Sequence, residues 1–348
     1  MGQTVPGSRT LQRIQAMERL GHEVRVIPTN LSGDTYEDRP SMIQRLRYRF
    51  RLPLDRASAN EVLINEAGSS KSDVIWLERS VEIKPATLRA VKAMTPDVQL
   101  VWYAEDDMMN PAHLSRYVER SLPLFDLWVT TKSFNAMPGE MPARGVRRAL
   151  FVNNSFDPDI HRPQPADDAL RAEFGADIGF VGTYEKERAE SIRKLCLAGL
   201  AVRVWGNDWD RMPSRPGNLR IEGRPVYDLE YAKAVSATKI NLCFLRKDNR
   251  DLQTCRSIEI PAIGGFMLHE RNDEITGLLA EGTEAAYFEN DEELIEACRY
   301  WLANGDAREA IASRGHDRIM GGGYRHDDRI AYILEELYSA NTEMAPRP

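Results

Sequence analysis

The chain has little cysteine and no long hydrophobic run. Its four cysteines are widely spaced and form no Cys-x-x-Cys pair, so the sequence predicts neither a disulfide framework nor a zinc site. No apolar stretch approaches the roughly 20 residues that cross a bilayer. The segment before Thr10 also lacks the apolar core of a signal peptide. These absences favour a reduced, cytoplasmic location.

The sequence also lacks an excess of positive charge. Its 348 residues include 46 Lys and Arg against 53 Asp and Glu, a net charge of −7, so we do not expect nucleic acid as a partner. The content of 42% hydrophobic and 28% charged residues is that of a globular protein. At roughly 150 residues per domain, this length predicts about two domains.

Strand and helix patterns alternate through the first half of the chain. Short apolar runs predict strands at 23–27, 73–77, 98–103 and 127–130. Apolar residues at helical spacing predict helices at 10–20, 85–94 and about 111–121. Such alternation is typical of a parallel sheet covered by helices on both faces. We therefore expect a Rossmann-like domain over 1–155.

One strand of this domain is missing from the pattern. An α/β domain should have a strand before its first loop, here Gly2 to Gly7, but only Met1 stands there. We interpret this as a late start that truncates the first strand. The N-terminal sheet should then show a gap or a substitute strand before Gln3. A complete parallel sheet that Met1 itself enters would contradict this expectation.

The alternation starts again after a linker rich in Pro, Asp and Asn at 153–165. Strands are expected at 178–181, 201–205, 240–245 and 266–268, and helices at 187–198, 292–304 and 306–313. We expect a second Rossmann-like domain over 166–324, followed by a helix over 325–340. Two such domains would face a central cleft at the carboxyl ends of their strands.

The turn after the predicted strand at 178–181 is a candidate phosphate site. Gly182 and Thr183 stand where the strand gives way to a helix, so a phosphate could approach the backbone there. Arg188 is close enough in sequence to add a positive charge. An ordinary strand–helix turn explains these residues equally well, because neither a dinucleotide fingerprint nor a P-loop is present.

A second candidate stretch has two acidic residues separated by seven others. These are Asp251 and Glu259, and a glycine pair follows them. Thr254, Cys255 and Arg256 could open a helix whose N-terminus faces a diphosphate. Glu259 is placed to accept ribose hydroxyls and Asp251 those of an attached sugar. The alternative is that Asp251 is only a cap at the start of the helix.

Asp106 and Asp107 are the candidate catalytic residues of the first domain. They follow the strand at 98–103, where one of them could remove a proton from an acceptor hydroxyl. A helix-capping turn is the alternative. The Asp-x-Asp patterns at 157–159 and 208–210 are too short to be specific, so we expect no metal site.

Taken together, these motifs resemble the GT-B glycosyltransferases of group 1. The usual signature of that fold is Glu-x7-Glu followed by Ala-x-x-x-Gly. More closely, the chain resembles the CgeB-like (spore maturation protein) family of these enzymes. The resemblance covers nearly the whole chain and rests on the segments 12–24, 103–107, 157–163, 178–182, 254–264 and 324–329. Each motif is loose, but their order and spacing are specific.

The resemblance implies a GT-B fold with an acceptor domain, a nucleotide-sugar domain and a final helix that crosses back to the first domain. It makes Glu259 the ribose ligand and Asp251 a donor-sugar contact, and it assigns the diphosphate to the two turns described above. Asp251 replaces the commoner Glu and is shorter by one methylene. Because GT-B enzymes need no obligatory metal, clustered cations are expected to stabilise the leaving diphosphate. The candidates are Arg188, Arg246, Lys247 and Arg256, of which Arg256 lies inside the signature.

We therefore expect a glycosyltransferase that moves a sugar from a nucleoside-diphosphate donor to a hydroxyl-bearing acceptor, with no cofactor besides the donor. The acceptor is a glycan, a lipid-linked sugar, a protein or a small molecule. The sequence does not decide whether the transfer retains or inverts the anomeric configuration of the sugar. The alternatives are a nucleotide-sugar epimerase of the same fold and a non-catalytic nucleotide-sugar-binding protein. The basic run Arg45–Arg51 could contact anionic lipid, and a solvated helix face explains it as well.

Overall fold

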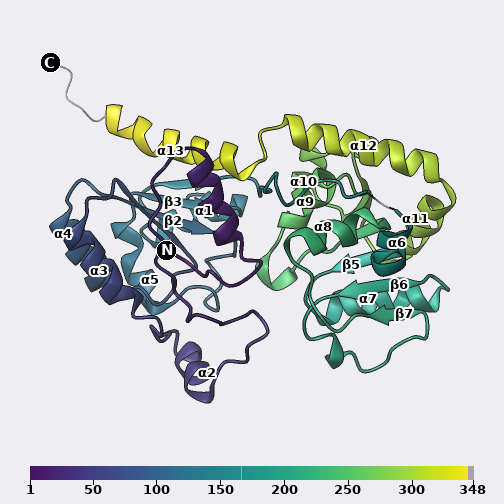
Figure 1. Ribbon diagram of the computed structural model, residues 1–348, viewed down its shortest axis with the longest axis horizontal. Helices are drawn as coiled ribbons and strands as arrows, with labels where there is room; N and C mark the ends of the chain where they lie inside the picture. Colours follow the sequence, from purple (N-terminus) through teal and green to yellow (C-terminus); the bar gives the residue numbers. More distant parts are fainter. Residues whose placement is uncertain (166, 344–348) are drawn as a thin grey trace. The chain divides into compact units, whose positions relative to one another are not determined.

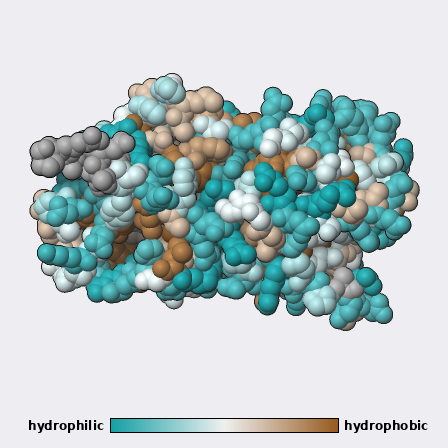
Figure 2. All heavy atoms as spheres, turned by 90° about the horizontal axis from the view of Figure 1, so that it is seen from above, coloured by the Kyte–Doolittle hydropathy of each residue, from teal (hydrophilic) through white to brown (hydrophobic). Residues whose placement is uncertain are grey.

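The computed structural model describes residues 1–165 and 167–343, which form two compact units (Figure 1). Unit 1 contains Met1–Asn153 and the last helix, and unit 2 contains Asn154–Arg325. Each unit is built around a parallel β-sheet. One face of the surface is mostly hydrophilic, with hydrophobic residues confined to separate patches (Figure 2).

The sheet of unit 1 is parallel throughout, in the order β1-β2-β3-β4. Its strands are β1 (Val74–Glu78), β2 (Gln99–Ala104), β3 (Leu127–Thr130) and β4 (Ala149–Phe151). Its helices are α1 (Arg9–Arg19), α2 (Met42–Arg49), α3 (Ala59–Ser69), α4 (Pro85–Met94), α5 (Arg116–Ser121) and α13 (His326–Glu343). Helices α3, α4 and α5 cover one face, and α1 and α13 cover the other (Figure 1). Since both faces are buried, the strands are nearly continuous apolar runs.

Helix α13 belongs to unit 1 through its contacts with α1. Arg19 of α1 forms an ion pair with Asp327 at 2.7 Å, and Gln12 contacts the ring of His326 at 3.2 Å. Ile330, Ile333 and Leu337 are buried against the sheet. Helix α13 thus completes, with α1, the layer of helices on this face of the unit 1 sheet.

The sheet of unit 2 has six parallel strands in the order β10-β9-β8-β5-β6-β7. They are β5 (Ala176–Val181), β6 (Val202–Trp205), β7 (Leu219–Ile221), β8 (Thr238–Cys243), β9 (Met267–Glu270) and β10 (Ala286–Phe288). The helices are α6 (Asp168–Phe174), α7 (Lys186–Leu197), α8 (Asp228–Ser236), α9 (Cys255–Ala262), α10 (Asp273–Leu278), α11 (Asp291–Ala303) and α12 (Gly305–Gly321). Helices α7 and α11 pack on one face and α8, α9 and α10 on the other. The expected α/β class with two Rossmann-like sheets is confirmed.

The predictions were wrong for some elements of both units. The strand expected over 23–27 is not formed, and its end makes only one parallel bridge, between Gly2 and Pro28. The helix expected over 111–121 begins only at Arg116, because Ser115 caps it by accepting from the amide of Val118 at 3.1 Å. The short strands β4, β7 and β10 were missed, as runs of three residues carry no clear period.

Candidate functional site

The sheet of unit 2 reverses its strand order between β5 and β8. From β5 the chain moves outward through β6 and β7, and then returns to β8 on the other side of β5. The loops that leave these two strands therefore diverge, and ligands of open α/β sheets bind in the crevice at such a point. Gly182 follows β5, and the loop 244–254 follows β8. Both predicted phosphate-binding stretches thus begin at this reversal of strand order, which we call the switch point.

Two arginines from different helices converge on one aromatic ring here. The guanidinium groups of Arg188, on α7, and Arg256, on α9, lie 5.4 Å and 5.6 Å from the ring centre of Phe180. Burial, and then repulsion by Arg256, lower the pKa of Arg188 to about 10. The Nε atoms of both arginines are buried without a hydrogen-bond partner. Two neighbouring cations with unmet donors form a site suited to an anion.

The turn between β5 and α7 is glycine for a steric reason. A Cβ added to Gly182 would lie 2.7 Å from the ring of Phe180 and 3.5 Å from the guanidinium of Arg188. The carbonyl of the next residue, Thr183, accepts from Arg188 at 3.3 Å, while the Thr183 side chain is exposed. The structure therefore brings Gly182, Thr183 and Arg188 together where β5 gives way to α7.

The N-terminus of α9 is fixed by a chain of hydrogen bonds. The amide of Thr254 donates to Oγ of Ser257 at 2.9 Å, and that hydroxyl lies 2.8 Å from Nε2 of His269. Nδ1 of His269 lies 2.6 Å from the carbonyl of Glu270, which can only accept. The proton is therefore on Nδ1, so Ser257 donates to Nε2. This chain ties the first turn of α9 to β9 and holds its N-terminal amides in place.

Cys255 contributes its backbone to this turn, and its side chain is turned into the protein. The thiol donates to Oδ1 of Asn154 at 3.3 Å and is buried. The amide of Asn154 donates in turn to Oε1 of Gln253 at 3.0 Å. These contacts fasten the start of unit 2 to the turn before α9. The side chain therefore packs in the protein interior. If Cys255 contacts a phosphate, the contact is made by its backbone amide.

Glu259 lies one turn into α9 and faces His161 from the linker. Both side chains are buried, and Oε1 of Glu259 is 3.8 Å from Nε2 of His161. The amide of Asp157 donates to Nδ1 of the same ring at 3.0 Å, so that nitrogen carries no proton. Nε2 therefore presents its proton to Glu259. The structure thus places His161 at this carboxylate.

Asp251 closes the loop that precedes α9. Its two carboxylate oxygens accept from the amide of Arg246 at 3.3 Å and from the side chain of Asn249 at 2.7 Å. Arg246 extends from this loop to Glu185, at 3.1 Å, and Glu185 also pairs with Arg188 at 2.7 Å. Glu185 thus links the two loops of the switch point. Sequence reasoning missed it, since an acidic residue directly before a helix is usually only a cap.

In unit 1 the two predicted catalytic aspartates have different surroundings. Asp107 is buried, and its Oδ1 accepts from the amide of Met109 at 3.0 Å and from the side chain of Asn135 at 2.9 Å. Asp106 instead lines a cavity of about 250 Å³, where its Oδ2 lies 3.9 Å from Arg79 and 4.0 Å from His113. The capping alternative therefore fits Asp107, and Asp106 is the one with access to a cavity.

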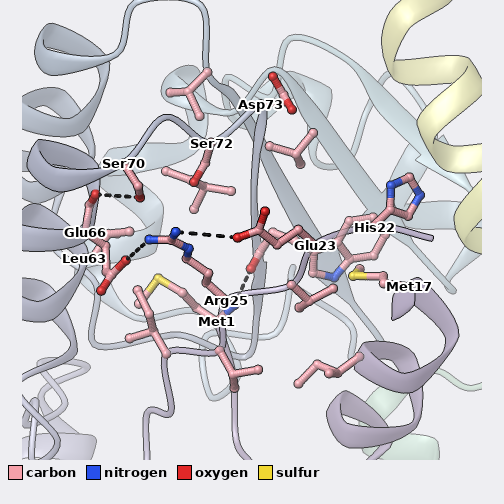
Figure 3. Close-up of a pocket in the computed structure, with 18 of the residues that line it drawn as sticks. Met1, Met17, His22, Glu23, Arg25, Leu63, Glu66, Ser70, Ser72 and Asp73 are labelled. Carbon is pink, nitrogen blue, oxygen red and sulfur yellow. Dashed lines mark hydrogen bonds and ion pairs between the residues drawn. The ribbon is translucent and has the colours of Figure 1, made fainter. Parts of the chain in front are cut away.

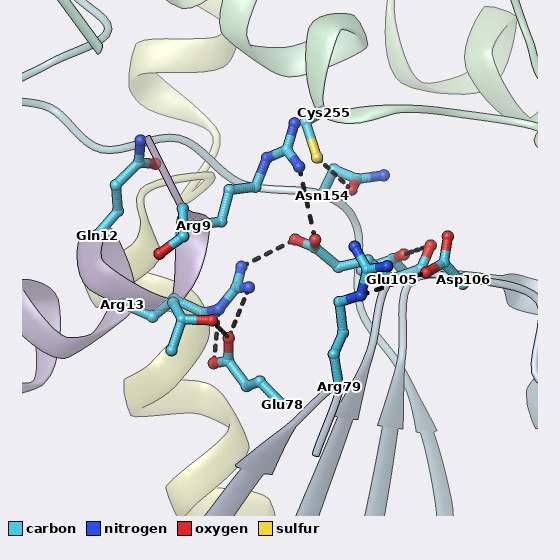
Figure 4. Close-up of polar contacts among 12 residues, drawn as sticks. Arg9, Gln12, Arg13, Glu78, Arg79, Glu105, Asp106, Asn154 and Cys255 are labelled. Carbon is cyan, nitrogen blue, oxygen red and sulfur yellow. Dashed lines mark hydrogen bonds and ion pairs between the residues drawn. The ribbon is translucent and has the colours of Figure 1, made fainter. Parts of the chain in front are cut away.

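A buried ion-pair network lies next to this cavity (Figure 4). Arg13 makes a two-pronged contact with Glu78, at 2.7 and 2.8 Å, and reaches Glu105 at 2.9 Å. Arg9 adds a second positive charge at 3.6 Å from Glu105. Burial favours the neutral acid, but Arg13 and Arg9 hold the pKa of Glu105 down at about 2. The network was not predicted, because its members lie far apart in the sequence.

None of the described helices is both long and apolar enough to cross a membrane. Within 1–165 and 167–343, no group of three His, Cys, Asp or Glu residues could hold a metal ion.

Comparison with known proteins agrees with this geometry. Residues 187–335, which include nearly all of α7, the loop 244–254 and α9, match the family model described as glycosyl transferase-like. No curated protein matches the sequence. The fold is that of the GT-B enzymes, and residues 187–335 are similar to glycosyl transferases.

Several solved structures share this fold at low sequence identity. A glycosyltransferase from Rickettsia africae ESF-5 is 9% identical with a TM-score of 0.64, and the match covers 97% of this chain and 96% of that one. Anabaena Alr3699/HepE, in complex with UDP and glucose, is 13% identical with a TM-score of 0.63, covering 96% and 98%. Sucrose-phosphate synthase from Thermosynechococcus elongatus is 10% identical with a TM-score of 0.60, covering 90% and 83%.

Proposed function

We propose that the switch point of unit 2 binds a nucleoside-diphosphate sugar, whose sugar the enzyme transfers to a hydroxyl acceptor. The observation that carries this is the pair of guanidinium groups on Phe180, with buried donors that no protein group satisfies. A diphosphate brings several acceptor oxygens and negative charge to Arg188 and Arg256. The same groups stabilise the charge that grows on the diphosphate as the sugar leaves.

In this proposal the diphosphate is held by Gly182, Thr183 and the first turn of α9, besides the arginines. Glu259 binds the ribose hydroxyls, and His161 orients its carboxylate. No metal or further cofactor takes part, since cations and helix amides already supply the charge. Transfer should then keep its rate in EDTA, and a loss that Mg²⁺ or Mn²⁺ restores would contradict this part of the proposal.

Because the Anabaena structure holds UDP and glucose, UDP-glucose is the first donor to test. A panel of UDP-, GDP-, dTDP- and CMP-sugars in a thermal-shift assay should show one class that stabilises the protein. Product analysis then separates the functions: a transferase needs an acceptor, whereas an epimerase converts the donor alone. Failure of every nucleotide sugar to shift the melting temperature would favour a non-catalytic protein.

A Glu259→Gln variant tests the ribose contact. Glutamine keeps the shape of the side chain and replaces one acceptor oxygen by a donor, so the KM for the donor should rise about tenfold or more, by loss of a charged hydrogen bond. Glu296→Gln, at an exposed position of α11, is the control and should leave the KM unchanged. Full transfer activity with an unchanged KM in Glu259→Gln would remove this residue from the site. The finer contact of Asp251 with the sugar is a further part of the proposal.

For the acceptor we propose the cavity of unit 1 that contains Asp106. It is polar, and it combines the carboxylate with Arg79, His113 and the hydroxyl of Tyr48. In an inverting reaction Asp106 would be the base, whereas a retaining reaction leaves the proton to the departing phosphate. The anomeric configuration of the product, determined by NMR, decides between the two.

We further propose that the enzyme is CgeB-like, acts in the cytoplasm and meets a lipid-bearing acceptor through α2. This helix has no buried residue, and its apolar side chains are more than half exposed: Met42, Ile43, Leu46 and Tyr48, with Phe50 directly after it. Arginines alternate with them, a combination that favours anionic membrane surfaces. An Ile43→Gln, Leu46→Gln variant should lose binding to phosphatidylserine vesicles. Leu197→Gln, equally exposed in unit 2, should not.

A further inference from the structure

Two cavities of unit 1 differ in whether their polar groups have partners. The larger, of about 650 Å³, lies along the outer edge of β1, and Arg25 pairs in it with Glu66 at 3.2 Å (Figure 3). Among its described lining residues, none has a buried side-chain nitrogen or oxygen without a hydrogen-bond partner. The smaller, of about 250 Å³, contains Asp106, and we call it the acceptor cavity. Two of its lining residues, Glu82 and Trp102, have such an unpaired atom.

The carboxyl of Glu82 differs from the other carboxyls of the acceptor cavity in having no cation beside it. The other three each face an arginine: Asp34 with Arg56 at 3.0 Å, Glu105 with Arg13 at 2.9 Å and Asp106 with Arg79 at 3.9 Å. Glu82 forms no ion pair with any described residue, and its buried Oε1 has no hydrogen-bond partner. Burial raises the pKa of this carboxyl to about 7, so charged and neutral forms coexist near neutral pH. Its Oε1 thus lacks the partner that a buried polar group normally has.

The loop after β1 that carries Glu82 is fastened to two helices. Asn60 of α3 donates to the carbonyl of Glu82 at 3.1 Å and accepts from the amide of Lys84 at 2.9 Å. Ser115, directly before α5, donates to the carbonyl of Val81 at 2.5 Å. These hydrogen bonds fix the backbone on both sides of Glu82. The carboxyl is therefore held at the wall of the cavity before a ligand arrives.

Trp102 supplies an unmet donor to the same cavity. It lies on β2, and its indole Nε1 is buried without a hydrogen-bond partner. Its ring stacks on Trp128, with 5.3 Å between the ring centres, and meets the edge of Phe125 at 5.5 Å. This aromatic packing keeps the ring from turning towards a partner elsewhere in the protein. An indole N–H only donates, so the partner that it lacks is an acceptor.

These two groups distinguish between classes of ligand. An ammonium group can pair with Glu82 but offers no acceptor to Trp102. A phosphate can accept from Trp102 but brings a second negative charge to Glu82. A hydroxyl both donates and accepts, so it suits Trp102 and either protonation state of Glu82. The cavity volume equals that of about eight water molecules in the liquid, which is room for one sugar ring and not for a chain of them.

We propose that the acceptor cavity binds a neutral sugar unit at the end of the acceptor, with hydroxyl groups of this sugar bonded to Glu82 and Trp102. This inference rests on the proposed function, in which the cavity of Asp106 takes the acceptor. A sugar O–H donates to Oε1 of Glu82, and a hydroxyl oxygen accepts from Nε1 of Trp102. The apolar face of the sugar ring packs on Tyr48, which lines the cavity from α2 and is 54% exposed. Amino sugars and sugar phosphates are then the poorer ligands.

The test measures the binding of methyl glycosides of neutral hexoses by ligand-observed NMR. Trp102→Phe removes the N–H and keeps an aromatic ring, so the Kd of the tightest glycoside should rise about 2- to 10-fold. Glu82→Met removes the carboxyl at similar length, and the Kd should rise about tenfold or more. Trp128→Phe is the matched control and should leave the Kd unchanged. Its indole nitrogen is also buried without a partner, but Trp128 does not line the cavity.

Monodeoxy analogues of the same glycoside give a second readout. One of them should bind the wild type more weakly than the parent glycoside does, and this difference should vanish in Trp102→Phe, because that variant cannot bond to the missing hydroxyl. A purely structural effect of the substitution would weaken all the analogues alike, and that result would contradict the inference. So would equal effects of Trp102→Phe and Trp128→Phe, or wild-type protein that binds no glycoside. Tighter binding of glucosamine or glucose 6-phosphate than of the neutral glucoside would overturn it as well.

Calorimetric titration of the same variants with UDP, or with the preferred nucleotide, separates this inference from the proposed function. Both cavity variants should keep the nucleotide affinity of the wild type, because the nucleotide site is in unit 2. If no nucleotide sugar binds the wild type but the glycoside binds and responds to the variants, the proposed function alone fails. If nucleotide binding and transfer are intact but glycoside binding does not respond to Glu82→Met and Trp102→Phe, this inference alone fails.

Discussion

Replacement of Arg256 by methionine separates a ligand-binding role from a structural one. The pKa of Arg188 falls from 12.5 to about 10, which corresponds to about 3 kcal/mol of unfavourable interaction in the charged state. Burial accounts for the largest share and Arg256 for the next. Arg256→Met removes that repulsion and keeps a side chain that packs on Phe180. Without ligand, the variant should therefore unfold at the same temperature as the wild type or slightly above it.

Binding of the nucleotide should change in the opposite direction. A charged hydrogen bond to a phosphate is worth about 1.5–3 kcal/mol, so the Kd for UDP or the preferred nucleotide should rise roughly 10- to 150-fold. Calorimetric titration and thermal unfolding of the same preparations give the two quantities. Arg193→Met is the matched control, because Arg193 lies on α7 but pairs only with Glu190 at the surface. A lower melting temperature with unchanged affinity in Arg256→Met would refute the anion site.

Further predictions concern unit 1. Burial raises the pKa of Glu82 to about 7, so the wild type should lose stability as the pH rises from about 4.5 through 7, and Glu82→Gln should remove this loss in denaturant titrations. Asp107→Asn should lower the melting temperature by disturbing the contact with Asn135, whereas Asp106→Asn should lower activity with little change in stability; the reverse pattern would exchange their roles. Because the pKa of the Met1 amine is lowered, stability should rise as the pH approaches 8, and N-terminal acetylation should abolish this rise.

The order of strands and helices in unit 2 was largely predictable, because its segments have clear periods and well-spaced turns. The strands expected at 178–181, 201–205 and 240–245 correspond to β5, β6 and β8. That the turn at Gly182 and the turn before α9 belong together was implied only by the resemblance to the GT-B enzymes. In the structure the strands that precede these two stretches, β5 and β8, are neighbours.

The physical character of the site was less predictable, because it depends on contacts between distant residues. The sequence does not show that Phe180 carries two guanidinium groups, or that Glu185 joins Arg188 to Arg246. Asp106 and Asp107 are adjacent and chemically identical, and only the tertiary contacts of Asn135 and Arg79 distinguish them. The segment 23–27 has the composition of a strand but lacks the neighbour that would complete its ladder.

The position of Glu185 has a consequence for the speed of ligand exchange. Its carboxylate occupies Arg188 and Arg246 in the unliganded protein, so these cations are already neutralised when an anion arrives. An incoming phosphate exchanges one anionic partner for another, and its net affinity is the difference between two ion pairs. When the ligand leaves, the carboxylate can return at once. Such an internal competitor weakens the binding of free phosphate and shortens the time for which the nucleotide product stays bound.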